Sequence, residues 1–326
     1  MAEPTLGRRR LAWTRYWAEG DLHSLGTSFP GNYADSIGTY WQAEFAVCKT
    51  GAQILDIGCG NGPLAKLLVD LDPSSGPSLT GIDLANPTPR WLSQQSDSVK
   101  ARIQFHGGVA AEKLPFPDNA FDLIVSQFGI EYSELETSQA EVVRVLKLDG
   151  RIALLIHHSE SLPVVASKHE LRHLSFLEQI GFLNIVEKMI PYMSKLAALQ
   201  KARALNDDPS AKETRCLFDE AEALIEKRSH TEPIPDLLVD TRICARECFR
   251  LAAQAGVQPA IARLSQYRTF LRDSEIRLTE LIKSAQDEKG VQRIQARFSA
   301  LREKPVQISP TPLLVNDHIF GWVLRA

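Results

Sequence analysis

The chain has 326 residues, of which 44% are hydrophobic, so it is long enough to bury a full core and to hold more than one structural part. A formal net charge of −3, with 24% charged residues of both signs, gives no broad positive field and argues against nucleic acid as a partner. Five scattered cysteines form no disulfide framework and no apolar stretch approaches the roughly 20 residues of a membrane span, so we expect a cytoplasmic protein.

Aromatic side chains are concentrated in the N-terminal segment, which we predict to form a helical cap over residues 1–50. Trp13, Tyr16 and Trp17 follow the i, i+3, i+4 spacing of one helix face. Aromatic stripes with this spacing commonly pack a helix against the core. The alternative is that the segment covers a substrate, with Gly31-Asn32-Tyr33 near a bound cofactor.

A glycine-rich loop follows this segment. A short apolar run over residues 53–57 breaks into Gly58, Gly60 and Gly62, and a helical pattern starts at Pro63. This order predicts a buried strand, a tight loop and a helix N-terminus. Because glycine lets a ligand approach the backbone closely, the loop predicts a site for an adenosine-type cofactor. Pro63 stands where the dinucleotide pattern GxGxxG has its last glycine, which argues against NAD.

Strand and helix patterns alternate from the glycine loop onwards, which predicts a parallel sheet covered by helices. Right-handed crossovers place the loops that follow strands along one sheet edge, where we expect the active site. The predicted strands cover residues 53–57, 79–84, 103–106, 123–127 and 152–157, and the predicted helices cover residues 63–71, 138–146 and part of 89–99.

A second motif, Gly81-Ile82-Asp83-Leu84, lies about one βα unit after the glycine loop. A carboxylate at the end of a second strand can accept hydrogen bonds from both hydroxyls of a ribose. Asp83 is therefore a candidate for holding the ribose of the cofactor.

Three segments together resemble a known family: Leu55 to Gly62, Gly81 to Asp83, and Ala111 to Ile124. In this order and spacing they are similar to the class I S-adenosylmethionine-dependent methyltransferases, and most of all to those of ubiquinone and menaquinone biosynthesis. The resemblance covers roughly residues 50–158. It implies an α/β fold with a Rossmann-like, seven-stranded sheet, mostly parallel with an antiparallel last strand, and S-adenosyl-L-methionine as the cofactor, which becomes S-adenosyl-L-homocysteine.

The resemblance also implies which residues hold this cofactor. The glycine loop would wrap its methionine end, Asp56 would hold its ammonium group and Gln127 would lie near the sulfonium. Asp83 would bind the ribose, and the backbone at Ala111-Glu112 would flank the adenine. The family often has an aspartate where this chain has Ala110, which weakens the adenine assignment. The predicted cofactor-binding residues are Asp56, Gly58, Cys59, Gly60, Gly62, Asp83, Leu84, Ala111, Glu112 and Gln127.

Methyl transfer from a sulfonium is an in-line displacement that needs alignment, a dry site and sometimes a base. Glu131 and Tyr132 follow the fourth strand, and His157 ends the fifth strand at the same edge. We predict these three as the catalytic residues. Glu131 and Tyr132 have packing or helix-start roles as alternatives, and because strand residues alternate in direction only one of His157 and His158 readily faces the pocket.

Helical segments without a convincing strand follow Ser159, which predicts a large helical insertion after the fifth strand, at residues 161–288. We expect this insertion to serve as a lid or as a dimerisation surface. The cofactor-binding core then covers residues 51–160, and residues 289–326 complete it with a final helix and a C-terminal β-hairpin.

The hairpin is predicted from two strand patterns, at residues 306–308 and 318–324, on either side of the turn-like Asn316-Asp317. A rival interpretation ends the core earlier. It places the last core helix at residues 174–180 and a strand at residues 183–186, after the break at Gly181.

Two patterns in the insertion suggest metals. The stretch from His169 to His173 reads HExxH, which on a helix can bind zinc. Lys168 and Arg172 are unlike the apolar helix that usually carries this motif, and no convincing third ligand follows, so we predict no metal site. Cys244 and Cys248 at i, i+4 are more often two small buried residues than metal or redox ligands.

We predict an S-adenosylmethionine-dependent methyltransferase that acts on a small-molecule acceptor at oxygen, nitrogen or carbon. Two alternatives stay open. One is a peptide or protein substrate that docks on the insertion, and the other is a non-catalytic protein that binds the cofactor for regulation or scaffolding. The intact glycine loop and Asp83 argue against the second alternative, and a homodimer through the insertion is a further prediction.

Overall fold

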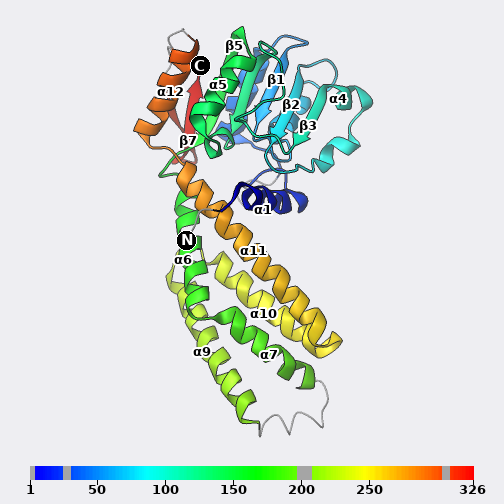
Figure 1. Cartoon of the computed structure of the whole chain (residues 1–326), viewed down its shortest axis with the longest axis vertical. Helices are drawn as coiled ribbons and strands as arrows, with labels where there is room; N and C mark the ends of the chain where they lie inside the picture. The colour runs from blue at the N-terminus through cyan, green and yellow to red at the C-terminus, as the bar shows by residue number, and fades with distance from the viewer. Residues whose placement is uncertain (1–3, 25–30, 197–207, 303–308) are drawn as a thin grey trace. The chain divides into compact units, whose positions relative to one another are not determined.

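The computed structural model describes the chain in four ranges, residues 4–24, 31–196, 208–302 and 309–326 (Figure 1). The contacts divide it into two compact units, one of Met1–Val165 with Glu280–Ala326 and one of Ala166–Thr279. Across the four ranges, no helix combines the length and the apolar character that crossing a bilayer requires.

The first unit is built on one seven-stranded sheet in the order β3-β2-β1-β4-β5-β7-β6. Neighbouring strands from β1 to β5 run parallel, whereas β7 is antiparallel to β5 and β6 is antiparallel to β7. This confirms the predicted, mostly parallel Rossmann-like sheet. The strands are β1 Gln53–Ile57, β2 Ser78–Asp83, β3 Ile103–Gly107, β4 Phe121–Gln127, β5 Leu146–His157, β6 Thr311–Val315 and β7 His318–Arg325.

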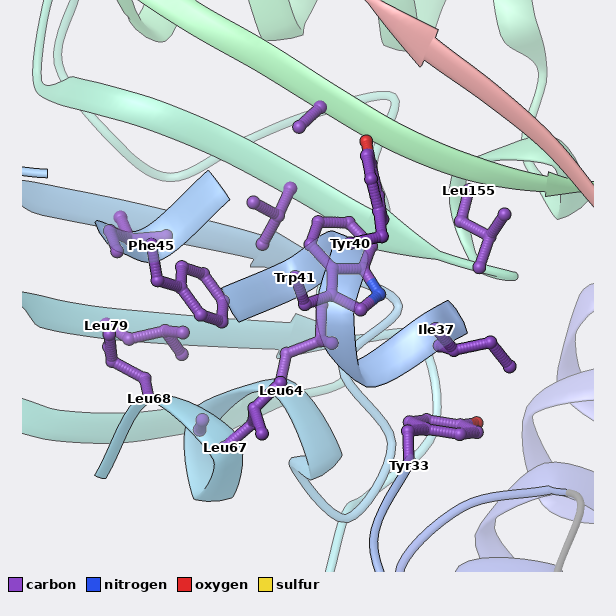
Figure 2. Close-up of a cluster of buried hydrophobic side chains, with 14 of the residues drawn as sticks. Tyr33, Ile37, Tyr40, Trp41, Phe45, Leu64, Leu67, Leu68, Leu79 and Leu155 are labelled. Carbon is purple, nitrogen blue, oxygen red and sulfur yellow. The ribbon is translucent and has the colours of Figure 1, made fainter. Parts of the chain in front are cut away.

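Helices cover both faces of the sheet, so successive strand residues enter two different cores. Ile54 packs in the core of one face, whereas Leu55 packs in the core of the other. Figure 2 shows the first core, in which the side chains of Ile37, Trp41 and Leu64 gather against the strands. The helices around the sheet are α1 Leu6–Ala18, α2 Asp35–Ala46, α3 Pro63–Leu71, α4 Asp97–Arg102, α5 Leu135–Val145 and α12 Glu288–Arg302, with 3₁₀ turns η1 Arg90–Gln94 and η2 Ile130–Tyr132.

Capping side chains set two helix starts that the apolar pattern misplaces. Helix α5 begins before the predicted residue 138 because the Glu134 carboxylate accepts hydrogen bonds from the amides of Glu136 and Thr137. The helix predicted between residues 89 and 99 is two elements, η1 and α4, since the Ser96 hydroxyl caps α4 by accepting from the Val99 amide.

The C-terminal hairpin forms the antiparallel end of the sheet. The turn at Asn316-Asp317 is confirmed, with φ of 48° and 62° as the tightest hairpin turns require. The strand predicted at residues 306–308 lies outside the described residues, and the strand that pairs with β7 is β6, at Thr311–Val315. Pro312 lacks an amide hydrogen, which an edge strand such as β6 tolerates.

Between β5 and α12, the described part of the chain forms helices and one isolated bridge, between His158 and Gln286. The rival strand at residues 183–186 is wrong, because these residues are part of α7. Within the second unit, α7 packs against α9 and α10 around a core that includes Phe182, Leu238 and Cys248. The inserted helices are α6 Leu162–Gln179, α7 Phe182–Leu196, α9 Pro209–Thr231, α10 Asp236–Ala255 and α11 Val257–Ser284.

Candidate functional site

The glycine loop turns sharply at the end of β1. Gly58, Gly60 and Gly62 have φ of 71°, 50° and 78°, in the left-handed region that glycine adopts without strain. At Gly58 a side chain is also excluded by space, because a Cβ atom would lie 2.6 Å from the Cα of Gly129. The loop after β1 and the loop after β4 are therefore in direct backbone contact.

Asp83, at the end of β2, is bonded to this loop. Its Oδ2 accepts from the Gly60 amide at 2.9 Å and its Oδ1 accepts from the Ala85 amide at 2.7 Å. Burial raises the pKa of Asp83, while the two amide hydrogen bonds oppose the shift by favouring the carboxylate. The two bonds fix the plane of the carboxylate beside the glycine loop.

A cavity of about 110 Å³ opens against Asp83. The predicted residues Gly58, Asp83, Leu84, Ala111 and Glu112 line it, whereas the other predicted cofactor residues lie outside its wall. Those others are Asp56, Cys59, Gly60, Gly62 and Gln127.

Helix α1 supplies a wall that the sequence interpretation did not assign to the cofactor site. Leu6, Arg9, Trp13 and Trp17 line the cavity, and their spacing of three, four and four residues is that of one helix face. The i, i+3, i+4 pattern of Trp13, Tyr16 and Trp17 indicated a helix with an aromatic face, but it gave no sign of Leu6 or Arg9.

Two buried side chains at the strand ends keep polar atoms free. Asp56 Oδ2 and Gln127 Nε2 have no hydrogen-bond partner among the described residues. Burial, and after it the charge of Asp83, raises the pKa of Asp56 to about 8. Gln127 Oε1 accepts from the indole nitrogen of Trp41. One polar atom on each side chain is thus left to bind something else.

The three predicted catalytic residues lie close together. Glu131 Oε1 accepts from the His157 amide at 2.9 Å, and the rings of Tyr132 and His157 are 6.0 Å apart in an edge arrangement. Of the three, only Tyr132 lines the described cavity. Glu131 and His157 are buried, at 4% and 2% exposure, so they lie behind that wall.

Burial shifts the titration of these groups in different directions. It raises the pKa of Glu131 to about 7, and it lowers the pKa of His157 to about 3. It also raises the pKa of Tyr132, with a smaller contribution from the Glu131 charge. Glu131 Oε2 and His157 Nδ1 have no hydrogen-bond partner within the described ranges.

The loop between β4 and η2 holds these groups in place. Ser126 Oγ donates to the Ile57 carbonyl at 2.7 Å and accepts from the Ile130 amide at 2.9 Å, which joins the end of β1 to this loop. Phe128 has φ of 53°, a conformation that costs a non-glycine residue on the order of 1–3 kcal/mol. Its ring stacks on His157 with centroids 4.0 Å apart. No motif in the sequence pointed to Ser126 or Phe128.

The other histidine at this edge has a structural role. His158 stacks on Trp322 at 4.6 Å, and its Nδ1 accepts from the Glu160 amide at 3.0 Å.

The Gly31-Asn32-Tyr33 stretch does approach the glycine loop, because the Asn32 side-chain amide donates to the Pro63 carbonyl at 2.9 Å.

The HExxH residues lie on α6. Both ring nitrogens of one of the two histidines, His173, already have hydrogen-bond partners within the protein. His173 Nε2 lies 3.2 Å from the Pro233 carbonyl, and its Nδ1 accepts from Arg228 at 3.2 Å. Cys244 and Cys248 are buried in the apolar core of the second unit. No group of three or more histidine, cysteine or acidic side chains that could hold a metal ion is found where the structure describes the chain.

Comparison with protein families finds that residues 55–154 match the family described as a methyltransferase domain. The ubiquinone/menaquinone biosynthesis C-methyltransferase UbiE of Citrifermentans bemidjiense is 32% identical over 149 residues, which are 42% of this chain and 61% of that protein. The malonyl-[acyl-carrier protein] O-methyltransferase of Geobacter sulfurreducens is 38% identical over 114 residues, which are 34% of this chain and 41% of that protein.

The chain spans about half the length of the curated relatives it matches. Among solved structures, the YcgJ protein from Bacillus subtilis is 29% identical and covers 43% of this chain and 58% of its own, with a TM-score of 0.31. Residues 55–154, which match the methyltransferase domain family, include the glycine loop, Asp83 and the loop after β4.

Proposed function

Because residues 55–154 resemble the class I S-adenosylmethionine-dependent methyltransferases, we propose that the chain transfers a methyl group from S-adenosyl-L-methionine to a small-molecule acceptor. The observation that carries this proposal is the carboxylate of Asp83, which two backbone amides orient at the wall of the cavity. This is the placement that hydrogen bonds to ribose hydroxyls require.

The chemistry of the surrounding side chains fits the rest of the cofactor. Asp56 and Gln127 offer buried polar atoms without protein partners among the described residues, as a site for an amino-acid group would. A bound ammonium group would lower the raised pKa of Asp56 and favour its carboxylate. We assign Ala111 and Glu112 to the adenine end, since both line the cavity on the side of the loop after β3.

When bound, the cofactor supplies a methyl group on a sulfonium, and the chain's own residues align the acceptor and exclude water. We propose Glu131 as the group that takes a proton from the acceptor, because a pKa of about 7 suits a base near neutral pH. Since Glu131 lies behind the cavity wall, this role requires the wall to open when the acceptor binds. Its Oε1 is held by the His157 amide, which leaves Oε2 as the free oxygen. Tyr132 and the uncharged ring of His157 would orient the acceptor.

The names of the relatives support a small acceptor over a protein surface. UbiE is named as a C-methyltransferase of quinone biosynthesis, and the Geobacter protein as an O-methyltransferase of a malonyl group on a carrier protein. A peptide or protein substrate and a non-catalytic role remain the alternatives that experiments must separate.

Calorimetric titration with S-adenosylmethionine and S-adenosylhomocysteine tests the cofactor assignment. We expect Asp83→Ala and Gly60→Arg each to weaken binding at least tenfold, about 1.4 kcal/mol. Asp70→Ala is the matched control, because Asp70 is a surface carboxylate that pairs with Lys66 at 2.8 Å. Wild-type affinity in both site variants would overturn the assignment.

Incubation of the protein with methyl-labelled cofactor and a cell extract tests the acceptor. We expect the label in a small molecule. Label in a protein band would instead favour the protein-substrate alternative, and tight cofactor binding without any labelled product would favour a non-catalytic role.

We also propose that the insertion forms a homodimer surface. Helices α9 and α10 expose large apolar side chains, among them Leu217, Leu224 and Ile243 at 41%, 49% and 47%. Analytical ultracentrifugation of the full chain tests this, and a monomer at all concentrations would overturn it.

A further inference from the structure

Helix α1 presents a single face to the cavity beside Asp83. Leu6, Arg9, Trp13 and Trp17 make up that face. The Trp17 ring lies directly on the glycine loop, since a Cβ atom on Gly60 would be 2.6 Å from the ring. The glycine at this position therefore makes room for an aromatic ring of α1.

The space under α1 is small for a nucleoside. The cavity measures about 110 Å³, whereas sites for ligands of that size commonly measure about 300–1,000 Å³. Helix α1 is one wall of this cavity, so movement of α1 away from the loop would enlarge the space for a cofactor with an adenosine and an amino-acid end. What holds α1 in place thus bears on how the cofactor enters and leaves.

One carboxylate makes two of the side-chain contacts that hold α1, while Arg10 in the same helix donates to Asn86 Oδ1 at 3.2 Å. Glu280 Oε1 pairs with the Arg9 guanidinium, and Glu280 Oε2 accepts from the Trp13 indole nitrogen at 2.9 Å. Arg9 Nη2 also donates to the Tyr132 carbonyl at 2.7 Å. We call Arg9, Trp13 and Glu280 the α1 latch. The Glu280 side chain is 8% exposed, so its contacts are shielded from water and weakly screened.

The C-terminal end of α1 is held differently. The Asn61 side-chain amide donates to the Trp17 carbonyl at 3.0 Å, and Arg90 donates to the Ala18 carbonyl at 2.7 Å. These bonds tie the end of the helix to the glycine loop and to η1. Loss of the Glu280 contacts would therefore loosen the N-terminal half of α1 more than its C-terminal end.

We propose that Glu280 is a positioning residue that keeps α1 closed over the cofactor site and so sets the rates at which cofactor binds and leaves. The proposal rests on the proposed function for the identity of the ligand. Glu280 lies in the last part of α11, which belongs to the first unit together with α1 and the cavity. Through Arg9, the same carboxylate also acts on Tyr132, one of the proposed acceptor-side residues.

Hydrogen exchange of the ligand-free protein tests the latch without assuming any cofactor. We expect Glu280→Gln to speed exchange of the amides in the first half of α1 at least tenfold, with a smaller change near Trp17. Glu280→Asp, which keeps the charge, should lie between the variant and the wild type. Glu247→Gln is the control for the loss of a glutamate charge, because Glu247 pairs with Arg263 at 2.8 Å within the second unit. Wild-type exchange in Glu280→Gln would overturn the latch.

Stopped-flow binding of S-adenosylhomocysteine tests the consequence. We expect Glu280→Gln to raise both the association and the dissociation rate constants, the latter about tenfold, and the dissociation constant by less. An Arg9→Met, Glu280→Gln double variant should change the rate constants by less than the two single effects combined, because both single variants remove the Arg9–Glu280 pair. Additive effects, or rate constants equal to those of the wild type, would overturn the role of Glu280. Absence of binding in the wild type would instead refute the proposed function, and hydrogen exchange would still decide on the latch.

Discussion

The sheet edge of the first unit and the core of the second unit bury polar side chains in different ways. At the sheet edge, Asp56, Glu131 and His157 each keep a buried polar atom without a partner in the described part of the chain. In the second unit, the Thr241 hydroxyl bonds to the Tyr267 hydroxyl at 2.9 Å, and His173 has a partner at each ring nitrogen.

An unpaired buried polar group costs about 1–3 kcal/mol, so the first unit keeps several such costs that hydrogen-bond partners normally remove. The second unit has fewer of them, because the unpaired atoms of His169 and Glu222 belong to side chains that are only partly buried. The difference indicates that the sheet edge is arranged for a ligand, whereas the core of the insertion is arranged for packing.

The largest expected effect is a loss of stability in the second unit, and it tests whether this unit can be destabilised without changing the cofactor site. Phe182 is fully buried in the core of the second unit, so Phe182→Ala should destabilise that unit by about 3–5 kcal/mol. All five tryptophans lie in the first unit, so their fluorescence reports on that unit, and far-UV circular dichroism is dominated by the helices. We expect the dichroism midpoint to fall while the fluorescence midpoint and cofactor affinity stay unchanged. Equal shifts in both signals would mean that the two units unfold as one.

Alanine substitutions at two glycines, one in each unit, should give the next largest loss of stability. Gly58 and Gly256 both have positive φ, 71° and 91°, but an added Cβ meets the Gly129 backbone at Gly58 and open space at Gly256. Gly58→Ala combines backbone strain with overpacking and should cost about 3 kcal/mol, whereas Gly256→Ala should cost about 1 kcal/mol. Denaturant unfolding, followed by fluorescence for the first and by dichroism for the second, measures both. Similar losses would contradict the close contact of the two loops.

Local patterns predicted the elements of the sheet well, because a buried strand and a glycine loop are encoded by adjacent residues. The order of β1, the loop and α3 and the turn at Asn316-Asp317 were predicted for this reason. The strand predicted at residues 306–308 lies outside the described residues, and the sequence did not predict β6 because Pro312 argues against a strand unless its position at the sheet edge is already known.

The candidate site could be predicted only in part. Asp83 and Ala111-Glu112 line the cavity because they follow strands, and strand ends meet at one edge. The role of Arg9 depends on Glu280, which is 271 positions away in the sequence. A contact between residues so distant in the chain leaves no periodic signal, and neither does the strained backbone at Phe128.

The last prediction concerns the buried carboxylate of Asp56 at the sheet edge, and it appears as a pH dependence. Burial, followed by the charge of Asp83, raises the pKa of Asp56 from 3.8 to about 8. Because the folded state then binds the proton more tightly than the unfolded state, the stability that this group contributes is complete below about pH 4 and is lost as the pH rises towards 8. Asp56→Asn removes this titration, so the variant should gain stability relative to the wild type over that interval, by on the order of 1 kcal/mol or more.

Denaturant midpoints of the ligand-free proteins at pH 5 and pH 8, followed by tryptophan fluorescence, measure this difference. Asp70→Asn serves as the control, because Asp70 is a surface carboxylate and its substitution should change stability equally at both pH values. Saturating S-adenosylhomocysteine should flatten the wild-type dependence, since an ammonium group beside Asp56 lowers its pKa towards the unfolded value. Parallel pH dependences of the wild type and Asp56→Asn would show that burial does not destabilise the Asp56 carboxylate. The contrast between the sheet edge and the core of the insertion would then rest on Glu131 and His157 alone.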